Sequence, residues 1–548
     1  MKLKDWFSRY QASFSYIGLV FAVLFFAASL SPSLLPRNYI VQGLLSGIEL
    51  AVGYGVGCLF VWVWKYLELP EFGGKATLVG KRAITIFAAV LASVSLWRAT
   101  IWQNSIRTRM EMEPLESAYP FTVLLIALVF GALLVGGARL FGKSCAYVIE
   151  KINRVFPRRV SNVLGISLVS ALGLLFVNGV LAKSALSVAD SVFSRIDAKV
   201  DAGIEQPERN VLSGSTDSLI LWNTIGRQGK DFISKGPTQE QLSDFLGKPA
   251  KQPVRVYVGL RSRDTPEERA ELALEELKRV GAFERSLLVV ATPTGTGWLD
   301  PGATDTIEYL HAGDTAIVSM QYSYLPSWIT IMVDPNRSRV AAQVLFEEVY
   351  EHWKNLPKEA RPKLYLHGLS LGSLGSETSG DLLTTFEDPI QGALWSGPPF
   401  PSRVWSQLTR AREPNSPAWL PVFRDASVVR FINQKSKPDP SSESWSSIRC
   451  IYIQHASDPM IFFSPSLLYQ KPEWLVGERG ADVSPYLDWY PIITFLQVAC
   501  DLPMATSVPI GYGHNYSPSE YLDAWIAITN PKDWDDADSV RLKQLLTP

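Results

Sequence analysis

The chain has 548 residues, which is too long for one ordinary domain and predicts at least two structural units. Its 52 basic and 53 acidic residues give a net charge of −1, and no stretch of the sequence concentrates positive charge on one face. Nucleic acid binding needs such a basic face, so this composition argues against nucleic acid as a partner.

The four cysteines show no metal-type spacing, and we expect neither a metal nor another cofactor. Cys58 and Cys145 fall in or beside apolar segments, whereas Cys450 and Cys500 fall in the more polar part of the chain. Four separate thiols are the simpler interpretation, and a Cys450–Cys500 disulfide stays open.

Long apolar stretches fill the N-terminal part of the chain. Five are long enough to cross a bilayer as helices: roughly 14–35, 40–64, 83–103, 120–141 and 162–182. The first follows basic residues, but its apolar core is long and four more spans follow, so we expect it to be retained rather than cleaved as a signal. Residues 1–183 are therefore predicted to form a multi-pass transmembrane domain.

Lys and Arg in the short loops predict the orientation of these spans, because cytoplasmic loops retain positive charge. The N-terminus, the loop between spans two and three and the loop between spans four and five carry most of it, including Lys2, Lys81 and Arg154. With five spans, the chain after residue 183 is expected on the extracytoplasmic side of the cytoplasmic membrane.

An ionisable residue, Glu49, lies within the second span and is by default a functional candidate. The same segment contains Gly43-x-x-x-Gly47 and Gly53-x-x-x-Gly57, a spacing typical of close helix packing. In that setting Glu49 could simply pair with a neighbouring side chain, and both interpretations stay open.

Residues 184–250 are predicted to form a stalk or linker, and residues 251–548 a globular domain. Short β-branched runs predict strands at 254–258, 287–291, 316–321, 364–367, 393–396 and 451–454, with helices near 265–280, 337–354 and 518–529 between or after them. Such alternation predicts an α/β fold with a mostly parallel sheet and helices on both faces.

Two long segments, 398–449 and 461–510, interrupt this alternation and are rich in aromatic residues. Segments of this length in a compact domain are usually lids or walls of a binding site. Aromatic walls beside a membrane would suit an acyl or otherwise amphiphilic substrate.

The predicted strand before Gly368 runs directly into Gly368-Leu-Ser370-Leu-Gly372 and then into a segment compatible with a helix. This is the context of a nucleophile elbow, in which glycines let the chain turn sharply while a strained serine lies at the carboxyl edge of the sheet. Ser370 is therefore the predicted nucleophile, in preference to a plain Gly/Ser turn.

A serine hydroxyl needs a base that takes its proton and an acid that orients the base. Of the five histidines, three lie before Ser370 in the chain, which leaves His455 and His514. We favour His514, because it lies in a glycine-rich loop before the last predicted helix. Asp458, after strand 451–454, completes the chain order Ser, Asp, His. Weaker alternatives for the acid are Asp381 and Asp501.

The oxyanion that forms during attack needs two hydrogen-bond donors. One is the backbone N–H of Leu371, the residue after the nucleophile, and the other comes from the loop after an earlier strand. Here that loop is Thr292-Pro-Thr-Gly-Thr-Gly-Trp298, so Thr294 or Gly295 is the expected second donor, unless the run is only a surface turn. The run lacks the Gly-Lys-Ser/Thr ending of a phosphate-binding loop.

Several motifs together resemble the bacterial membrane-anchored α/β-hydrolase family with an N-terminal multi-pass domain. They are Ser31-Pro-Ser-Leu-Leu-Pro-Arg37, Pro293-Thr-Gly-Thr-Gly-Trp298, Gln321-Tyr-Ser-Tyr-Leu-Pro-Ser-Trp328, Leu369-Ser-Leu-Gly-Ser373, His455-Ala-Ser-Asp-Pro459 and Gly513-His-Asn-Tyr516. The resemblance covers nearly the whole chain and implies a hydrolase fold for its C-terminal half. Leu369 departs from the family pattern, which often has an acidic residue there; this leaves the nucleophile intact but could alter the local charge.

These features predict a membrane-embedded serine hydrolase, esterase- or lipase-like, whose partners are the membrane and a lipid or envelope glycolipid ester. Two alternatives stay open: an acyltransferase with the same triad, and a non-catalytic membrane scaffold with a hydrolase fold. No pattern in the sequence indicates the oligomeric state.

Overall fold

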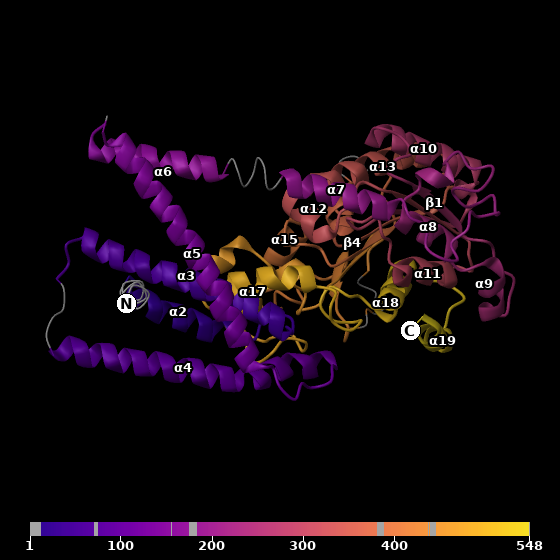
Figure 1. Ribbon diagram of the computed structural model, residues 1–548. Coiled ribbons are helices and arrows are strands. Elements are labelled where there is room, and N and C mark those ends of the chain that lie inside the picture. The colour runs from indigo at the N-terminus through magenta and orange to yellow at the C-terminus, as the bar shows by residue number, and fades with distance from the viewer. Residues whose placement is uncertain are drawn as a thin grey trace. The chain divides into compact units, whose positions relative to one another are not determined.

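The computed structural model describes residues 13–70, 75–154, 156–174, 183–380, 388–436, 438 and 445–546 (Figure 1). Contacts divide the chain into two compact units. The first unit runs to Leu186 and also includes Phe463–Val476 and Ala481–Met504; the second consists of Ser187–Phe462, Gly477–Gly480 and the chain from Ala505 onward. Most of the predicted 461–510 segment therefore belongs to the first unit.

The second unit is built on a seven-stranded sheet in the order β1-β3-β2-β4-β5-β7-β6. All neighbouring strands are parallel, which confirms the predicted α/β class. The strands are β1 (Val254–Val258), β2 (Leu287–Thr292), β3 (Thr315–Met320), β4 (Lys363–Leu369), β5 (Gly392–Ser396), β6 (Val429–Ile432) and β7 (Arg449–Ile453). Every residue of β1, β2, β3 and β5 is buried, as apolar runs between two helical layers require.

Helices cover both faces of this sheet. They form two groups, and within each group the helices contact one another as well as the strands. One group consists of α10 (Pro266–Arg279), α13 (Asn336–Lys354) and α14 (Leu371–Ser376); another pairs α11 (Pro301–Leu310) with α18 (Pro518–Thr529). Helices α10 and α18 begin with capping boxes at Thr265 and Ser517, which fix where each helix starts.

The first unit consists mainly of helices: α2 (Tyr16–Ser29), α3 (Tyr39–Tyr66), α4 (Lys75–Arg107), α5 (Pro120–Ile152) and α6 (Arg158–Leu174). Within the described residues, three of them, α3, α4 and α5, are long and apolar enough to cross a membrane. They correspond to the second, third and fourth predicted spans.

The first and fifth predicted spans do not reach that length in the described residues. The first contains α2, whose 14 residues are fewer than a bilayer crossing needs. The fifth overlaps α6 and continues into residues 175–182, which lie outside the described residues, as do the basic residues before position 13. The structure thus supports three of the five expected spans.

The two glycine pairs of α3 lie at close helix contacts, as their spacing predicts. A Cβ on Gly57 would lie 2.7 Å from the Cα of Gly18 in α2, and one on Gly47 would lie 3.2 Å from the backbone nitrogen of Gly131 in α5. Glu49, on the same helix, is fully buried. Neither of its carboxylate oxygens has a hydrogen-bond partner within the described part of the chain.

A buried ion pair fixes the loop after α2 to α17 (Ile493–Asp501) inside the first unit. Arg37 Nε donates to Asp501 Oδ1 at 2.9 Å, and both side chains are fully buried. The remaining guanidinium nitrogens donate to the Gln42 side chain and the Gln497 carbonyl. Asp501, one of the two alternative acids, is thus paired with Arg37, and Asp381, the other, lies outside the described residues.

We expect Asp501→Ala to destabilise the first unit by about 3–5 kcal/mol, because it leaves a buried guanidinium without its counter-ion. The check is the thermal unfolding midpoint of the detergent-purified protein. Glu240→Gln is the control: it removes an exposed pair with Arg209, whose side chains are 70% and 42% exposed, and should leave the midpoint unchanged. An Asp501 variant with the same unfolding midpoint as the wild type would show that the buried pair does not stabilise this loop.

Candidate active site

The chain turns sharply at Ser370, between the end of β4 and the start of α14. Ser370 has φ 59° and ψ −124°, a strained conformation for a residue with a side chain. A Cβ on Gly368 would lie 2.4 Å from the carbonyl carbon of Gly372, and one on Gly372 would lie 2.1 Å from the carbonyl oxygen of Thr292. Only glycine fits at either position, which explains the Gly-x-Ser-x-Gly pattern.

The backbone of Ser370 is fixed to the neighbouring strand, because its N–H donates to the Ser396 carbonyl at the end of β5 over 2.9 Å. The side chain is buried, with 2% of the residue exposed. Its hydroxyl has no hydrogen-bond partner within the described residues. The geometry therefore presents an uncommitted hydroxyl at the carboxyl edge of the sheet.

Asp458 and His514 meet, although 56 positions separate them in the sequence. His514 Nδ1 lies 2.6 Å from Asp458 Oδ2, and Asp458 is fully buried after β7. Two further donors reach the same carboxyl group: the Tyr516 hydroxyl to Oδ2 at 2.8 Å and the Met460 N–H to Oδ1 at 2.8 Å. This arrangement orients the ring so that its other nitrogen, Nε2, is directed away from the acid.

Because Gly397 has no side chain, the His514 imidazole can lie close to the end of β5, the strand to which the Ser370 backbone is hydrogen-bonded. Gly397 follows β5 with φ 54°, and a Cβ there would lie 2.5 Å from His514 Cε1. Since Ser370 is bonded to Ser396, serine and histidine both lie at the end of β5. Within the described chain neither the Ser370 hydroxyl nor His514 Nε2 has a hydrogen-bond partner, so the serine–histidine hydrogen bond that proton transfer needs is not formed in this state.

The two expected sources of oxyanion donors lie next to each other, since β2 pairs with β4 and Thr292 is opposite Gly368. Leu371 opens α14, where first-turn N–H groups have no partner inside the helix. The Thr294 N–H instead donates to Trp298 O at 2.9 Å, and the Gly295 N–H to Ser327 Oγ at 3.1 Å. Both are engaged in this state, so the second donor stays a prediction.

The histidines on or before β4 have structural contacts. His367 Nδ1 lies 2.9 Å from the Leu394 carbonyl, and burial lowers the pKa of His367 to about 4. His311 Nε2 lies 2.9 Å from the Thr529 hydroxyl, and burial likewise lowers the pKa of His311 to about 4. Both rings are therefore neutral at physiological pH. Burial also lowers the pKa of His352.

Sequence reasoning missed three residues around Asp458 and His514. Tyr516 is a third member of the hydrogen-bonded group, and Gly397 supports the imidazole. Glu520 lies 2.6 Å from the imidazole of His455. Tyr516 stood in the quoted Gly-His-Asn-Tyr run, and Glu520 in the capping box Ser517-x-x-Glu520, but neither pattern indicates which side chain it will meet.

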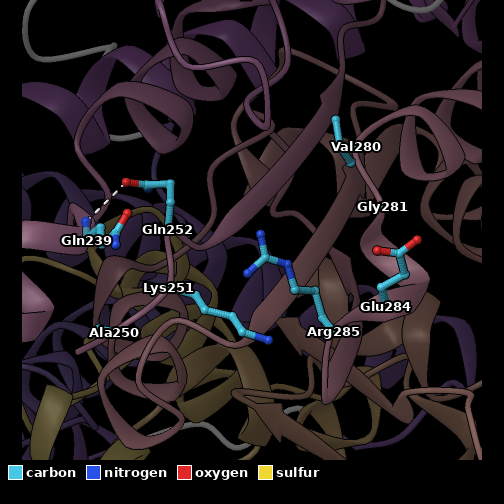
Figure 2. Close-up of a pocket in the computed structure, with 8 residues that line it drawn as sticks. All are labelled: Gln239, Ala250, Lys251, Gln252, Val280, Gly281, Glu284 and Arg285. Carbon is cyan, nitrogen blue, oxygen red and sulfur yellow. Dashed lines mark hydrogen bonds between the residues drawn. The ribbon is translucent and has the colours of Figure 1, made fainter. Parts of the chain in front are cut away.

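A cavity of about 460 Å³ lies at a different edge of the sheet (Figure 2). Its lining comes from the segments that precede β1 and β2, including Lys251 and Arg285. Ligands of open α/β sheets bind beyond the carboxyl ends of the strands, where Ser370 and Asp458 lie. We therefore do not assign the substrate to this cavity.

In the part of the chain that the structure describes, no group of three or more His, Cys, Asp or Glu side chains could hold a metal ion. The four cysteines, Cys58, Cys145, Cys450 and Cys500, are free thiols.

Comparison with known proteins identifies the family. A model described as the alpha/beta-hydrolase family matches residues 254–542, and a model described as the N-terminus of that family matches residues 30–237. No curated protein and no solved structure matched the chain. The first match covers every strand of the sheet as well as α18, and it includes Ser370, Asp458 and His514. Because it spans more than half of the 548 residues, the chain belongs to the alpha/beta-hydrolase family.

Proposed function

We propose that this protein is a membrane-bound serine hydrolase that cleaves esters with Ser370 as nucleophile, His514 as base and Asp458 as orienting acid. The observation that carries the proposal is the buried Asp458–His514 hydrogen bond of 2.6 Å beside a strained serine. The Asp458–His514 pair is the orienting half of a serine triad, and the Ser370 backbone is hydrogen-bonded to the end of β5, where Gly397 approaches the His514 ring; both observations support acyl transfer to serine.

In the proposed reaction, His514 Nε2 takes the proton of the Ser370 hydroxyl as the serine oxygen bonds to the carbonyl carbon of the ester. The carbonyl oxygen becomes an oxyanion, which the Leu371 N–H and a donor from the 293–298 loop stabilise. Asp458 stabilises the imidazolium, which then gives its proton to the departing alcohol. Water, activated by the same histidine, releases the acid and restores the serine.

A lipid or other amphiphilic ester, such as an envelope glycolipid, is the proposed substrate. Three helices of the first unit are long and apolar enough to cross a membrane. The chain segment between Asp458 and His514 contributes Phe463–Val476 and Ala481–Met504 to that same unit. A hydrolase whose acid and base flank a segment of its membrane-type unit is suited to substrates that partition into lipid.

Ser370→Ala should lower the rate of hydrolysis of p-nitrophenyl esters by at least about 10³-fold, since no other side chain supplies the nucleophile. The measurement is steady-state release of p-nitrophenol by the purified full-length protein. Ser243→Ala, in α9 (Gln239–Leu246), is the matched control and should retain wild-type rates. Retained activity in the Ser370 variant would reject the nucleophile, and a wild type inactive on all acyl chain lengths would favour the scaffold alternative.

Acyl transfer is a second candidate function, and the burial of Ser370 and His514 favours it. Ser370 is 2% exposed as a whole residue, and the side chain of His514 is 9% exposed. A buried acyl-enzyme excludes bulk water and leaves room for a bound alcohol to compete. A radiolabelled lipid ester incubated with the protein and an excess of glycerol or a sugar separates the two reactions. We expect labelled free acid as the main product; accumulation of a labelled new ester would replace hydrolysis by transfer.

We propose that the second unit lies on the outer side of the cytoplasmic membrane: the basic loops lie inside, and the predicted fifth span, 162–182, then carries the chain across. The test is a pair of C-terminal fusions, one to a phosphatase that is active only outside the cytoplasm and one to a fluorescent protein that matures only inside. The phosphatase fusion alone should be active. Fluorescence without phosphatase activity would reverse the orientation.

A further inference from the structure

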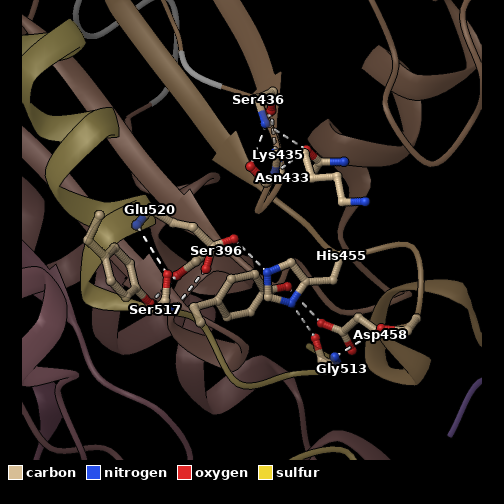
Figure 3. Close-up of polar contacts among 12 residues, drawn as sticks. Ser396, Asn433, Lys435, Ser436, His455, Asp458, Gly513, Ser517 and Glu520 are labelled. Carbon is tan, nitrogen blue, oxygen red and sulfur yellow. Dashed lines mark hydrogen bonds and ion pairs between the residues drawn. The ribbon is translucent and has the colours of Figure 1, made fainter. Parts of the chain in front are cut away.

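Residues 455–458, which follow β7, form successive hydrogen bonds with the loop that carries His514 (Figure 3). The Gly513 N–H donates to Ser457 Oγ at 3.0 Å, and His455 Nδ1 lies 2.8 Å from the Gly513 carbonyl. Asp458 then binds His514 itself. Three residues of the His-Ala-Ser-Asp-Pro motif thus bind three residues of the Gly-His-Asn-Tyr motif: His455 and Ser457 contact Gly513, and Asp458 contacts His514 and Tyr516.

Both ring nitrogens of His455 face hydrogen-bond acceptors. Nδ1 meets the Gly513 carbonyl, and Nε2 lies 2.6 Å from Glu520 Oε1, with both side chains buried. Burial alone would raise the pKa of Glu520, but the charge and hydrogen bond of His455 and the hydrogen bonds of Ser517 bring it below its usual value. A carbonyl only accepts, so the geometry assigns a proton to Nδ1 of His455; with Glu520 ionised, Nε2 carries a second proton and the ring is an imidazolium.

Gly513 has a conformational freedom that this contact removes. Its φ is 55°, in the left-handed region that glycine adopts without strain, and it directly precedes His514. The His455 ring also stacks on Tyr516, with ring centres 4.4 Å apart and planes inclined by 25°. Tyr516 in turn donates to Asp458. One buried ring therefore restrains the residue before His514 and supports a donor to its acid.

We propose that His455 is a positioning residue: as an imidazolium paired with Glu520, it holds the Gly513 carbonyl and so places His514 for proton exchange with Ser370. This inference rests on the proposed hydrolase function. A displacement of about 1 Å in a catalytic group costs on the order of 10²-fold in rate, so the loss of this one restraint should be visible in kcat.

Three variants separate positioning from general stability. In His455→Leu the donor to Gly513 is lost, and kcat should fall about 10–100-fold with KM unchanged. In His455→Asn the side-chain NH₂ takes the place of Nδ1–H and can still donate to Gly513, so kcat should recover to within about fivefold of the wild type.

Glu520→Gln is the matched control for the charge. Gln keeps the capping box with Ser517, and its NH₂ can donate to Nε2 of a neutral His455 whose Nδ1–H still meets Gly513. Its kcat should also stay within about fivefold of the wild type. Equal losses in the Leu and Asn variants, or an unaltered kcat in a folded Leu variant, would overturn the positioning role.

A spectroscopic measurement tests the charge without relying on activity. In full-length protein labelled with ¹⁵N-histidine, the signals lost in His455→Asn should be those of a ring with two protonated nitrogens at pH 7. One protonated and one unprotonated nitrogen would overturn the imidazolium assignment, even where the Leu variant fails to fold. A wild type that hydrolyses no ester would overturn the proposed function, and the positioning role with it, whatever the spectrum shows.

Discussion

The structure of the candidate site depends on one buried carboxyl group, that of Asp458. Three groups donate to it: the His514 ring, the Tyr516 hydroxyl and the Met460 N–H. Met460 precedes the segments that the chain contributes to the first unit, and the other two residues follow them. A buried carboxylate is costly unless such donors satisfy it, so the three contacts hold the acid and the loop together. The sheet order supplies the rest: β4, β5 and β7 are neighbours, and Ser370, Gly397 and Asp458 follow their carboxyl ends.

In each of the two units a buried polar contact joins segments that are distant in the sequence. In the first unit Arg37 pairs with Asp501, which fixes α17 to the loop after α2. In the second, His455 pairs with Glu520, which fixes the start of α18 to the end of β7. The chain leaves the second unit after Phe462, rejoins it briefly at Gly477–Gly480 and returns for good at Ala505, whose carbonyl accepts the His514 N–H at 2.8 Å. The return point is therefore bonded directly to the proposed base.

Much of the sheet could be predicted because six strands are runs of apolar, β-branched residues between turn residues. Strand β6 was missed, since Val429–Ile432 has only four residues inside the Pro- and Ser-rich 398–449 segment. The first span was overestimated because Ser31-Pro-Ser-Leu-Leu-Pro is apolar enough to extend a hydropathy window, whereas its prolines cannot continue the helix that ends at Ser29. A sequence pattern shows composition and periodicity, but it does not show at which residue the hydrogen bonds of a helix end.

The candidate site could be predicted only as far as chain order constrains it, and the roles of its residues stay predictions. Ser370, Asp458 and His514 follow from the elbow and from the order Ser, Asp, His, whereas the contacts of His455 with Gly513 and Glu520 join residues 58 and 65 positions apart and have no local signal. The same limit applies to the oxyanion loop: its glycines mark a close approach, but only coordinates show that the Thr294 N–H is engaged with Trp298.

The central claim is that Ser370 is a nucleophile activated by His514. It is tested most directly by exposing the full-length protein to a fluorophosphonate and locating the adduct by tandem mass spectrometry. The account predicts a single stoichiometric adduct on the hydroxyl of Ser370, formed at a rate that falls sharply in His514→Gln. An unmodified Ser370, or an adduct that forms equally fast without His514, would contradict it.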